Sequence, residues 1–321
     1  MTLAIAAILT GFIGLIWSAD RFVEGAAALA KNLGMSPIMI GLTIVAIGTS
    51  APEIIVSISA AMNDSGALAV GNALGSNLAN IGLVLGITAF ITPIPISTQV
   101  LRRGLPALIL VTVAASYCLI DHSLSRLDGV LLLLALGLIF TYLVKDKAHQ
   151  PNIELEVDTE SIHDMSFLRA WLLFLLGLVL LIATSQLLVW GAKEVATALG
   201  ISELVIGLTV VAVGTSLPEL AATVASAIKG HHDMAIGNIL GSNLFNLLAV
   251  MAIPGIIAPI ELSPEVFYRD YLAMTGLTLL LAVMLYLHRI LWNRASHSIG
   301  RFEGSLLLLG YAAYYYFLFT P

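Results

Sequence analysis

The chain has 321 residues, of which 59% are hydrophobic and 11% are charged, and its net charge is −6. A soluble globular chain carries about 25% charged residues, so this chain has too few to cover a water-soluble globule. The composition therefore argues against a soluble enzyme, a nucleic-acid-binding protein and a disordered scaffold, and it indicates an integral membrane protein. Cys118 is the only cysteine, which excludes an intrachain disulfide and a zinc site built from cysteines.

We expect an all-α integral membrane protein with ten transmembrane helices, because a spanning helix needs roughly 20 mainly apolar residues. The apolar runs lie near residues 2–30, 36–62, 67–91, 104–120, 127–144, 167–198, 203–228, 234–257, 270–288 and 303–319. The first and sixth runs are unusually long, which predicts tilted helices. No Lys or Arg precedes the first run, so we do not expect a cleaved signal peptide.

The distribution of positive charge predicts the orientation in the membrane. Alternate connections, starting with the first, hold 11 of the 14 Lys and Arg residues. The side enriched in Lys and Arg faces the cytoplasm in membrane proteins. We therefore expect a multi-pass protein of the inner (plasma) membrane with both termini on the outer, periplasmic side.

The sequence contains an internal repeat. Shifted by 166 residues, Gly34–Ile94 aligns with Gly200–Ile260 without a gap, with 28 of 61 positions identical. Equivalent helices are five spans apart, and five is odd, so the two halves must cross the membrane in opposite directions. Inverted repeats are typical of secondary transporters. A duplicated membrane protein that transports nothing is the alternative.

The repeat defines the expected domains. Residues 1–144 form a first five-helix half with the repeat core at 34–94. Residues 167–321 form a second five-helix half with the core at 200–260. Between them, residues 145–166 are polar and are expected to be a cytoplasmic linker.

The first repeated motif is GTSxPE, which ends at Glu53 and Glu219. A carboxylate at membrane depth costs several kcal/mol, so such residues face the protein interior and are functional candidates by default. The alternative is a protonated, hydrogen-bonded carboxyl. Pro52 and Pro218 precede the two acids and should free backbone carbonyls one turn upstream, near Ala46 to Gly48 in the first half and Ala212 to Gly214 in the second. Carbonyl oxygens are hard ligands suited to Na⁺ and Ca²⁺, although a kink with only a packing role remains possible.

The second repeated motif is GNxxGSN, and it places polar residues at helical spacing. Asn72, Ser76 and Asn80 fall at i, i+4 and i+8 and should share a helix face, and the second half repeats this stripe. Ser50 lies three residues before Glu53, so these two residues should share a face as well. For the first asparagine of each motif, Asn72 and Asn238, helix packing is an equally good explanation.

The combined oxygen inventory suits a hard cation. Ca²⁺ takes 6–8 oxygen ligands, which two carboxylates with hydroxyl, amide and carbonyl oxygens can supply. The inventory contains no thiolate or imidazole, so zinc, copper and iron–sulfur centres fit poorly. No nucleophile with its base, no phosphate-binding loop and no nucleic-acid-binding surface is present. We expect no cofactor and no enzymatic activity.

At these motifs the sequence resembles the cation/calcium antiporter superfamily, and most closely the prokaryotic sodium/calcium exchangers. The resemblance implies two inverted five-helix halves that exchange Na⁺ for Ca²⁺ at overlapping sites, with the long first and sixth helices sliding to alternate access. The ions would be bound by side chains and carbonyls carried over by position. These ligands are Glu53, Glu219, Thr49, Ser50, Thr215, Ser216, Ser76, Ser242, Asn80, Asn246, Ala46 and Ala212. Several relatives carry Asp at one of the positions of Asn80 and Asn246, so the pocket here holds −2 rather than −3.

The expected function is secondary active transport that exchanges Na⁺ for Ca²⁺ across the lipid bilayer by alternating access, with a monomer as the functional unit. An H⁺/Ca²⁺ antiporter that uses the same glutamate pair is the second hypothesis. A passive cation channel would need no counter-ion, and the inverted repeat speaks against it. An intramembrane enzyme lacks a visible nucleophile and base.

Overall fold

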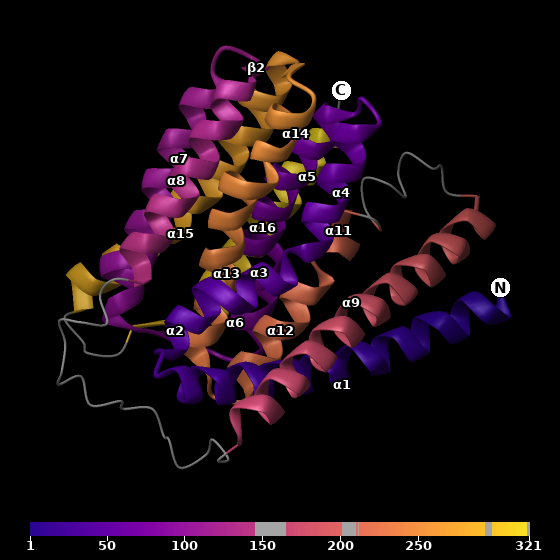
Figure 1. Ribbon diagram of the computed structural model, residues 1–321, viewed down its shortest axis with the longest axis vertical. Helices are drawn as coiled ribbons and strands as arrows, with labels where there is room; N and C mark the ends of the chain where they lie inside the picture. Colours follow the sequence, from indigo (N-terminus) through magenta and orange to yellow (C-terminus); the bar gives the residue numbers. More distant parts are fainter. Residues whose placement is uncertain (145–164, 201–209, 211, 293–296, 320–321) are drawn as a thin grey trace.

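The computed structural model describes residues 1–144, 165–200, 210, 212–292 and 297–319. Helices dominate this part of the chain (Figure 1). Seven of them are long and apolar enough to cross a membrane, or eight if one bent pair counts as a single span. The protein is therefore an all-α membrane protein. Each of the ten apolar runs overlaps helix in the described residues, but residues 201–209 and 211 of the seventh run, and linker residues 145–164, lie outside them.

Two long helices, α1 (Thr2–Leu33) and α9 (Phe167–Ala198), lie side by side along one edge of the bundle (Figure 1). Gly34 ends α1 in the left-handed conformation, with φ of 59° and its N–H directed at carbonyls of the last turn. This is a geometry that glycine adopts without strain. Ser166 caps the start of α9 by accepting a hydrogen bond from the Arg169 N–H.

Glycines let the backbones of α1 and α9 approach closely. A Cβ at Gly25 would lie 2.5 Å from the Phe174 nitrogen, and one at Gly177 would lie 2.5 Å from the Phe22 nitrogen. Small residues at a helix interface allow this approach in membrane proteins. The two long helices therefore form a tightly packed pair.

The GTSxPE motif forms a broken helix in the first half. The pieces are α2 (Pro37–Ile40), the π-helical turn η1 (Gly41–Val45), α3 (Ala46–Thr49) and α4 (Ala51–Met62). The chain bends by 44° at Ser50. Pro52 lies in the first turn of α4, where its missing N–H is tolerated. In the second half the described pieces are α11 (Ala212–Thr215) and α12 (Leu217–Ile228), with the break at Ser216.

The GNxxGSN motif occupies the next helix of each half. In the first half, α5 (Gly66–Leu78) continues through η2 (Ala79–Leu85) into α6 (Gly86–Ile91). In the second half, α13 (His232–Phe245) continues through η7 (Asn246–Val250) into α14 (Ala252–Ile257). A π-helical turn thus follows the motif in both halves. Such turns are rare and occur frequently at functional sites.

The remaining helices complete the bundle. They are η3 (Val100–Gly104) with α7 (Leu105–Leu119), α8 (Arg126–Val144), η8 (Val266–Tyr271) with α15 (Leu272–Trp292), and α16 (Arg301–Phe319). Two small antiparallel sheets, which the sequence did not predict, join connections: β1 (Ile94–Ile96) pairs with β4 (His297–Ile299), and β2 (Ser123–Leu124) pairs with β3 (Ile260–Glu261). They pair segments that are distant in sequence and too short for a periodic signal.

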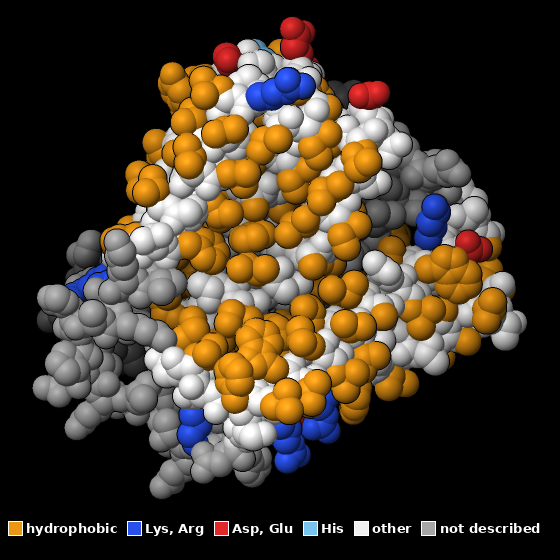
Figure 2. Space-filling model, in the orientation of Figure 1, with side chains coloured by type: hydrophobic (Ala, Val, Ile, Leu, Met, Phe, Trp, Pro, Cys, Tyr) orange, Lys and Arg blue, Asp and Glu red, His pale blue; other side chains and the backbone are white. Residues whose placement is uncertain are grey.

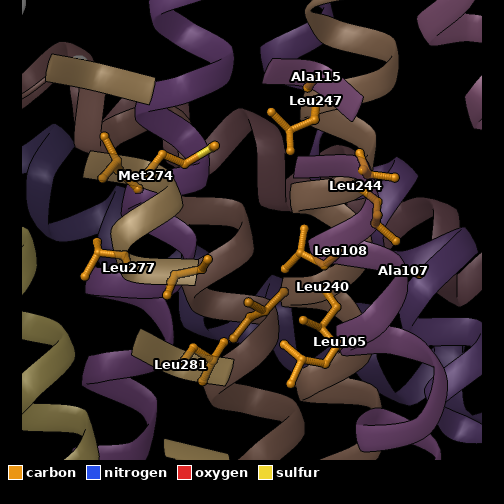
Figure 3. Close-up of a cluster of buried hydrophobic side chains, with 14 of the residues drawn as sticks. Leu105, Ala107, Leu108, Ala115, Leu240, Leu244, Leu247, Met274, Leu277 and Leu281 are labelled. Atoms are coloured by element: carbon orange, nitrogen blue, oxygen red, sulfur yellow. The ribbon is translucent and has the colours of Figure 1, made fainter. Parts of the chain in front are cut away.

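Part of the larger hydrophobic core lies between α7, α13 and α15, to which Leu108, Leu244 and Leu277 respectively belong (Figure 3). The outer surface is also apolar: hydrophobic side chains cover the middle of the face in Figure 2, and charged side chains lie toward its edges. Many large hydrophobic side chains are exposed, including Leu138 and Tyr117. A surface of this kind is expected to face lipid.

Candidate cation-binding site

Two glutamates are buried inside the helical bundle. Glu53 is 0% exposed and Glu219 is 1% exposed. Each lies in the first turn of a helix that restarts after a break, α4 and α12, where the helix N-terminus favours negative charge. In each carboxylate, Oε2 has no hydrogen-bond partner among the described residues. Buried oxygens without a donor are costly, and a cation can satisfy them.

Two serine hydroxyls of the first half donate hydrogen bonds to the two carboxylates, one of which belongs to the second half. Ser50 Oγ donates to Glu219 Oε1 at 3.2 Å, and Ser76 Oγ donates to Glu53 Oε1 at 3.3 Å. The spacing in the sequence placed Ser50 on the face of Glu53, but its hydroxyl reaches the glutamate of the other half. The reason is that Ser50 sits at the break, with φ of −81° and ψ of 7°, so regular helical spacing does not continue through it.

Thr49 brings further candidate ligands together. Its hydroxyl donates to Asn238 Oδ1 at 3.1 Å and lies 3.4 Å from both Ser242 Oγ and the Ala46 carbonyl oxygen. All four residues are buried. Asn238 in turn donates from Nδ2 to Thr223 Oγ1 at 3.0 Å. From the sequence, a packing role alone explained Asn238 equally well. The structure shows that Asn238 also accepts and donates hydrogen bonds within the cluster.

Asn80 and Asn246 lie at the start of the π-helical turns η2 and η7, and both are 0% exposed. Neither the oxygen nor the nitrogen of either amide has a partner among the described residues. The Ser216 hydroxyl is likewise buried and unpartnered there. Since buried polar side chains are nearly always hydrogen-bonded, these groups are available for a ligand.

Two further candidates of the second half lie on α11. Thr215 is half-buried in α11, and Ala212 is the first residue of that helix. The carbonyl of Gly214, which the following proline was expected to free, accepts a hydrogen bond from Ser185 Oγ of α9 at 3.1 Å. The Gly214 carbonyl is therefore not free. In the first half the Ala46 carbonyl accepts from the Ser50 N–H at 3.0 Å, and the Gly48 carbonyl also accepts from a backbone N–H, so the expectation of free carbonyls was wrong at these positions.

Sequence reasoning missed several buried polar residues around the site. Asn77 Nδ2 donates to the Asn243 carbonyl at 3.2 Å, and Ser57 Oγ donates to the Val250 carbonyl at 2.9 Å. Asn77 and Asn243 are the last residue of the GSN triplet in each repeat, so their identity in both copies was the available signal. No group of three or more His, Cys, Asp and Glu side chains occurs in the described ranges, so the cluster draws mainly on neutral oxygens.

The family model of the sodium/calcium exchanger protein matches residues 3–145 and 169–320. The chain belongs to the sodium/calcium exchanger family. The match covers both halves, including both copies of the two motifs. It agrees with the resemblance seen at Glu53 and Glu219, and it identifies the protein as a member of the cation/calcium antiporter family.

Individual members of the exchanger family align over nearly the full chain. CaxA of Alkalimonas amylolytica is 45% identical over 324 residues and covers 100% of both chains. The inner membrane protein YrbG of Escherichia coli is 39% identical over 316 residues, with 97% of this chain and 95% of YrbG covered. The solved structure of the sodium-calcium exchanger NCX_Mj superposes with a TM-score of 0.82 at 32% identity and covers 99% of both chains.

Proposed function

We propose that this multi-pass membrane protein exchanges Na⁺ for Ca²⁺ by alternating access, with the ions bound between the two repeats near the middle of the membrane. The observation that carries this proposal is the buried glutamate pair. Each half contributes one carboxylate, each carboxylate has an unpartnered oxygen, and hydroxyls from Ser50 and Ser76 bind the other oxygens. A site with two carboxylates among neutral oxygens suits Ca²⁺ and Na⁺.

The proposed ligand set consists of the twelve residues carried over from the family resemblance. The contacts of Glu53, Glu219 and Thr49 support a common pocket for most of them. The unpartnered amides of Asn80 and Asn246 support their inclusion. Thr215 and the carbonyls of Ala46 and Ala212 complete the set as proposals.

Close contacts between α1 and α9 support the inverted repeat of ten helices. Gly11 meets Leu188, and Gly177 meets Phe22. Each member of the first pair lies 166 positions from a member of the second, so one contact is the repeat image of the other. Such reciprocal contacts are expected where two similar units are related by a two-fold axis. The domains at 1–144 and 167–321, the linker at 145–166, the periplasmic termini and the functional monomer belong to the same proposal.

Alternating access requires that one set of helices moves against the rest, and the long α1 and α9 are the proposed moving pair.

Burial differs between repeat-equivalent positions of the two broken helices. Ile55 on α4 is 60% exposed, whereas its equivalent on α12, Ala221, is partly buried against the cluster formed by α1 and α9. This difference supports a conformation in which the long helices cover α12 and leave α4 open.

A proton could replace Na⁺ as the counter-ion, because a buried carboxylate pair can carry two protons instead of cations. The same residues support this second function. It predicts Ca²⁺ uptake driven by a pH gradient in the absence of Na⁺, which Na⁺/Ca²⁺ exchange does not.

The experiment measures Ca²⁺ uptake into vesicles that contain the purified protein, with Na⁺ and H⁺ gradients varied independently. We expect uptake that follows the Na⁺ gradient and that is lost in Glu53→Gln and Glu219→Gln. Arg103→Gln, a change outside the site, serves as the control for reconstitution. Full exchange by both glutamate variants would refute the proposed site, and current without any counter-ion would indicate a channel.

A further inference from the structure

A side chain of α9 donates a hydrogen bond to the backbone at the break in the second broken helix. Pro218 has no N–H, so the Gly214 carbonyl four residues earlier lacks its regular helical donor. Ser185 Oγ donates to this carbonyl at 3.1 Å. Ser185 is 3% exposed, and its hydroxyl therefore replaces the missing backbone donor in a place that water does not reach.

The same segment of α9 packs directly on the break. A Cβ at Gly214 would lie 2.3 Å from Val189 Cγ2, four residues after Ser185 on the same helix face. The hydrogen bond and the close approach thus occur together. Glu219, Thr215 and Ser216 lie within five residues of this carbonyl, so the position of α9 is coupled to the segment that carries the second glutamate.

The first half has the same break but lacks this donor. Pro52 has no N–H to donate to the Gly48 carbonyl, as Pro218 has none for Gly214, and a backbone N–H at the end of α3 donates to the Gly48 carbonyl instead. The residue equivalent to Ser185 under the 166-residue shift is Ala19 on α1, and alanine has no hydroxyl. The repeat is therefore asymmetric at this position, where α9 supplies a side-chain donor to the Gly214 carbonyl and the equivalent residue of α1 has none to supply.

We propose that Ser185 is a positioning residue that holds α9 on the second break and biases the equilibrium between the two access states. This inference rests on the proposed alternating access. In the conformation described here, α1 and α9 cover α12, and Ser185 binds Gly214. In the opposite state, repeat symmetry exchanges the roles of the halves, so Ala19 would approach Gly48 without forming a hydrogen bond. The described state alone gains this bond.

Loss of the Ser185 hydrogen bond should shift the equilibrium between the two access states in one particular direction. The covered helix, α12, ends beside Lys229, and the more open helix, α4, ends at Met62. Loss of the Ser185 bond should lower the population of the state that is open at the Met62 end. Apparent affinity falls in proportion to the fraction of protein in the competent state. The KM for Ca²⁺ should therefore rise on the Met62 face and fall on the Lys229 face.

The experiment compares Ser185→Ala, Ala19→Ser and the double variant in right-side-out and inside-out membrane vesicles. One hydrogen bond corresponds to about a twofold to tenfold change in an equilibrium. We expect the ratio of the two KM values to change by this factor in Ser185→Ala, and in the same direction in Ala19→Ser, because the new hydroxyl favours the opposite state. The double variant should show the largest change. A purely structural role would lower Vmax equally in both vesicle types and leave the ratio unchanged.

A second readout does not depend on transport. In a Cys118→Ala background, Ala221→Cys reports how far α12 is covered, because Ala221 is partly buried against a cluster built mainly from α1 and α9. Both Ser185→Ala and Ala19→Ser should raise its rate of reaction with a maleimide. Unchanged labelling and an unchanged KM ratio would overturn the role of Ser185. Altered labelling in a protein that exchanges no ions would instead contradict the proposed transport function alone.

Discussion

Ser18 Oγ and Thr184 Oγ1 lie 3.4 Å apart, and the two residues occupy equivalent positions in the repeat, 166 residues apart. A residue that touches its own repeat equivalent must lie close to the axis that relates the two copies. Asn77 and Asn243, also 166 apart, make a second such contact. The proposed two-fold axis therefore passes between α1 and α9 and between α5 and α13, and the glutamate pair belongs to the helices around it.

Close packing of α1 on α9 predicts strong sensitivity to added side-chain volume. In Gly25→Ala, the new Cβ would lie 2.5 Å from the Phe174 nitrogen and 2.7 Å from its Cα, and backbone atoms cannot move aside cheaply. We expect a loss of stability of about 1–3 kcal/mol, the usual range for overpacking. Thermal unfolding in detergent micelles measures it.

The matched control for this prediction is Gly137→Ala in α8, where no described atom lies within 4 Å of the added Cβ. Alanine is the better helix former, so this variant should keep or raise the melting temperature. Equal melting temperatures for Gly25→Ala and Gly137→Ala would contradict the tight contact.

The chain of hydrogen bonds from Thr49 through Asn238 to Thr223 predicts a second result. Thr49 donates its proton to Asn238, so its lone pairs remain available to a cation. Thr223 keeps the Asn238 amide in this orientation by accepting from Nδ2. Thr223→Val removes the acceptor at constant volume. We expect the KM for Na⁺ to rise by about twofold to tenfold, as for the loss of one hydrogen bond.

Thr223→Ser provides the comparison, because it keeps the hydroxyl and loses a methyl group. Its KM for Na⁺ should stay near that of the wild type. If packing were the only role of Thr223, serine would perturb exchange more than the isosteric valine. That order of effects would refute the proposed role of the hydrogen-bond chain in Na⁺ binding. Flux assays at a series of Na⁺ concentrations distinguish the two cases.

The sequence predicted the motifs well because their chemistry is local. A glutamate beside proline in an apolar run indicates a broken helix with a buried carboxylate, and Glu53 and Glu219 are indeed buried at such breaks. What the sequence missed depends on contacts between distant segments. The cross-half bond from Ser50 to Glu219 and the cap that Ser185 provides arise only when the two halves pack together. The repeat nevertheless contained one overlooked signal, the shared Asn77 and Asn243.

An ion pair between Lys229 and Asp20 links the end of α12 to α1. Lys229 Nζ lies 2.6 Å from Asp20 Oδ1 and also donates to the Asp20 carbonyl at 3.2 Å. Burial and the nearby Lys229 charge lower the pKa of His231, which follows Lys229 by two residues. Because both partners are substantially exposed, Lys229→Ala should cost only about 0.2–1 kcal/mol.

The contribution of this pair can be isolated with a double-mutant cycle of Asp20→Ala and Lys229→Ala, measured by thermal unfolding at low and high salt. We expect the coupling between the two residues to shrink in high salt, because exposed charges are screened. A coupling of zero at low salt would show that the observed contact does not stabilise the packing of α12 on α1.

Charge balance in the pocket predicts the stoichiometry of exchange. Glu53 and Glu219 contribute −2, and the other proposed ligands, including Asn80 and Asn246, are neutral. One Ca²⁺ or two monovalent cations would neutralise the pocket, whereas a third monovalent cation would leave an excess positive charge in a site of low dielectric. We therefore expect electroneutral exchange, in which Ca²⁺ uptake by vesicles does not respond to an imposed membrane potential.

Asn246→Asp adds a third carboxylate at a buried position of the proposed site, where the wild-type amide has no partner among the described residues. This variant should admit a third monovalent cation, so its Ca²⁺ uptake should become sensitive to the potential. Asn63→Asp adds the same charge at the exposed end of α4 and should leave exchange electroneutral. Voltage-dependent uptake by the wild type would show that backbone and hydroxyl dipoles hold a third cation without a third carboxylate.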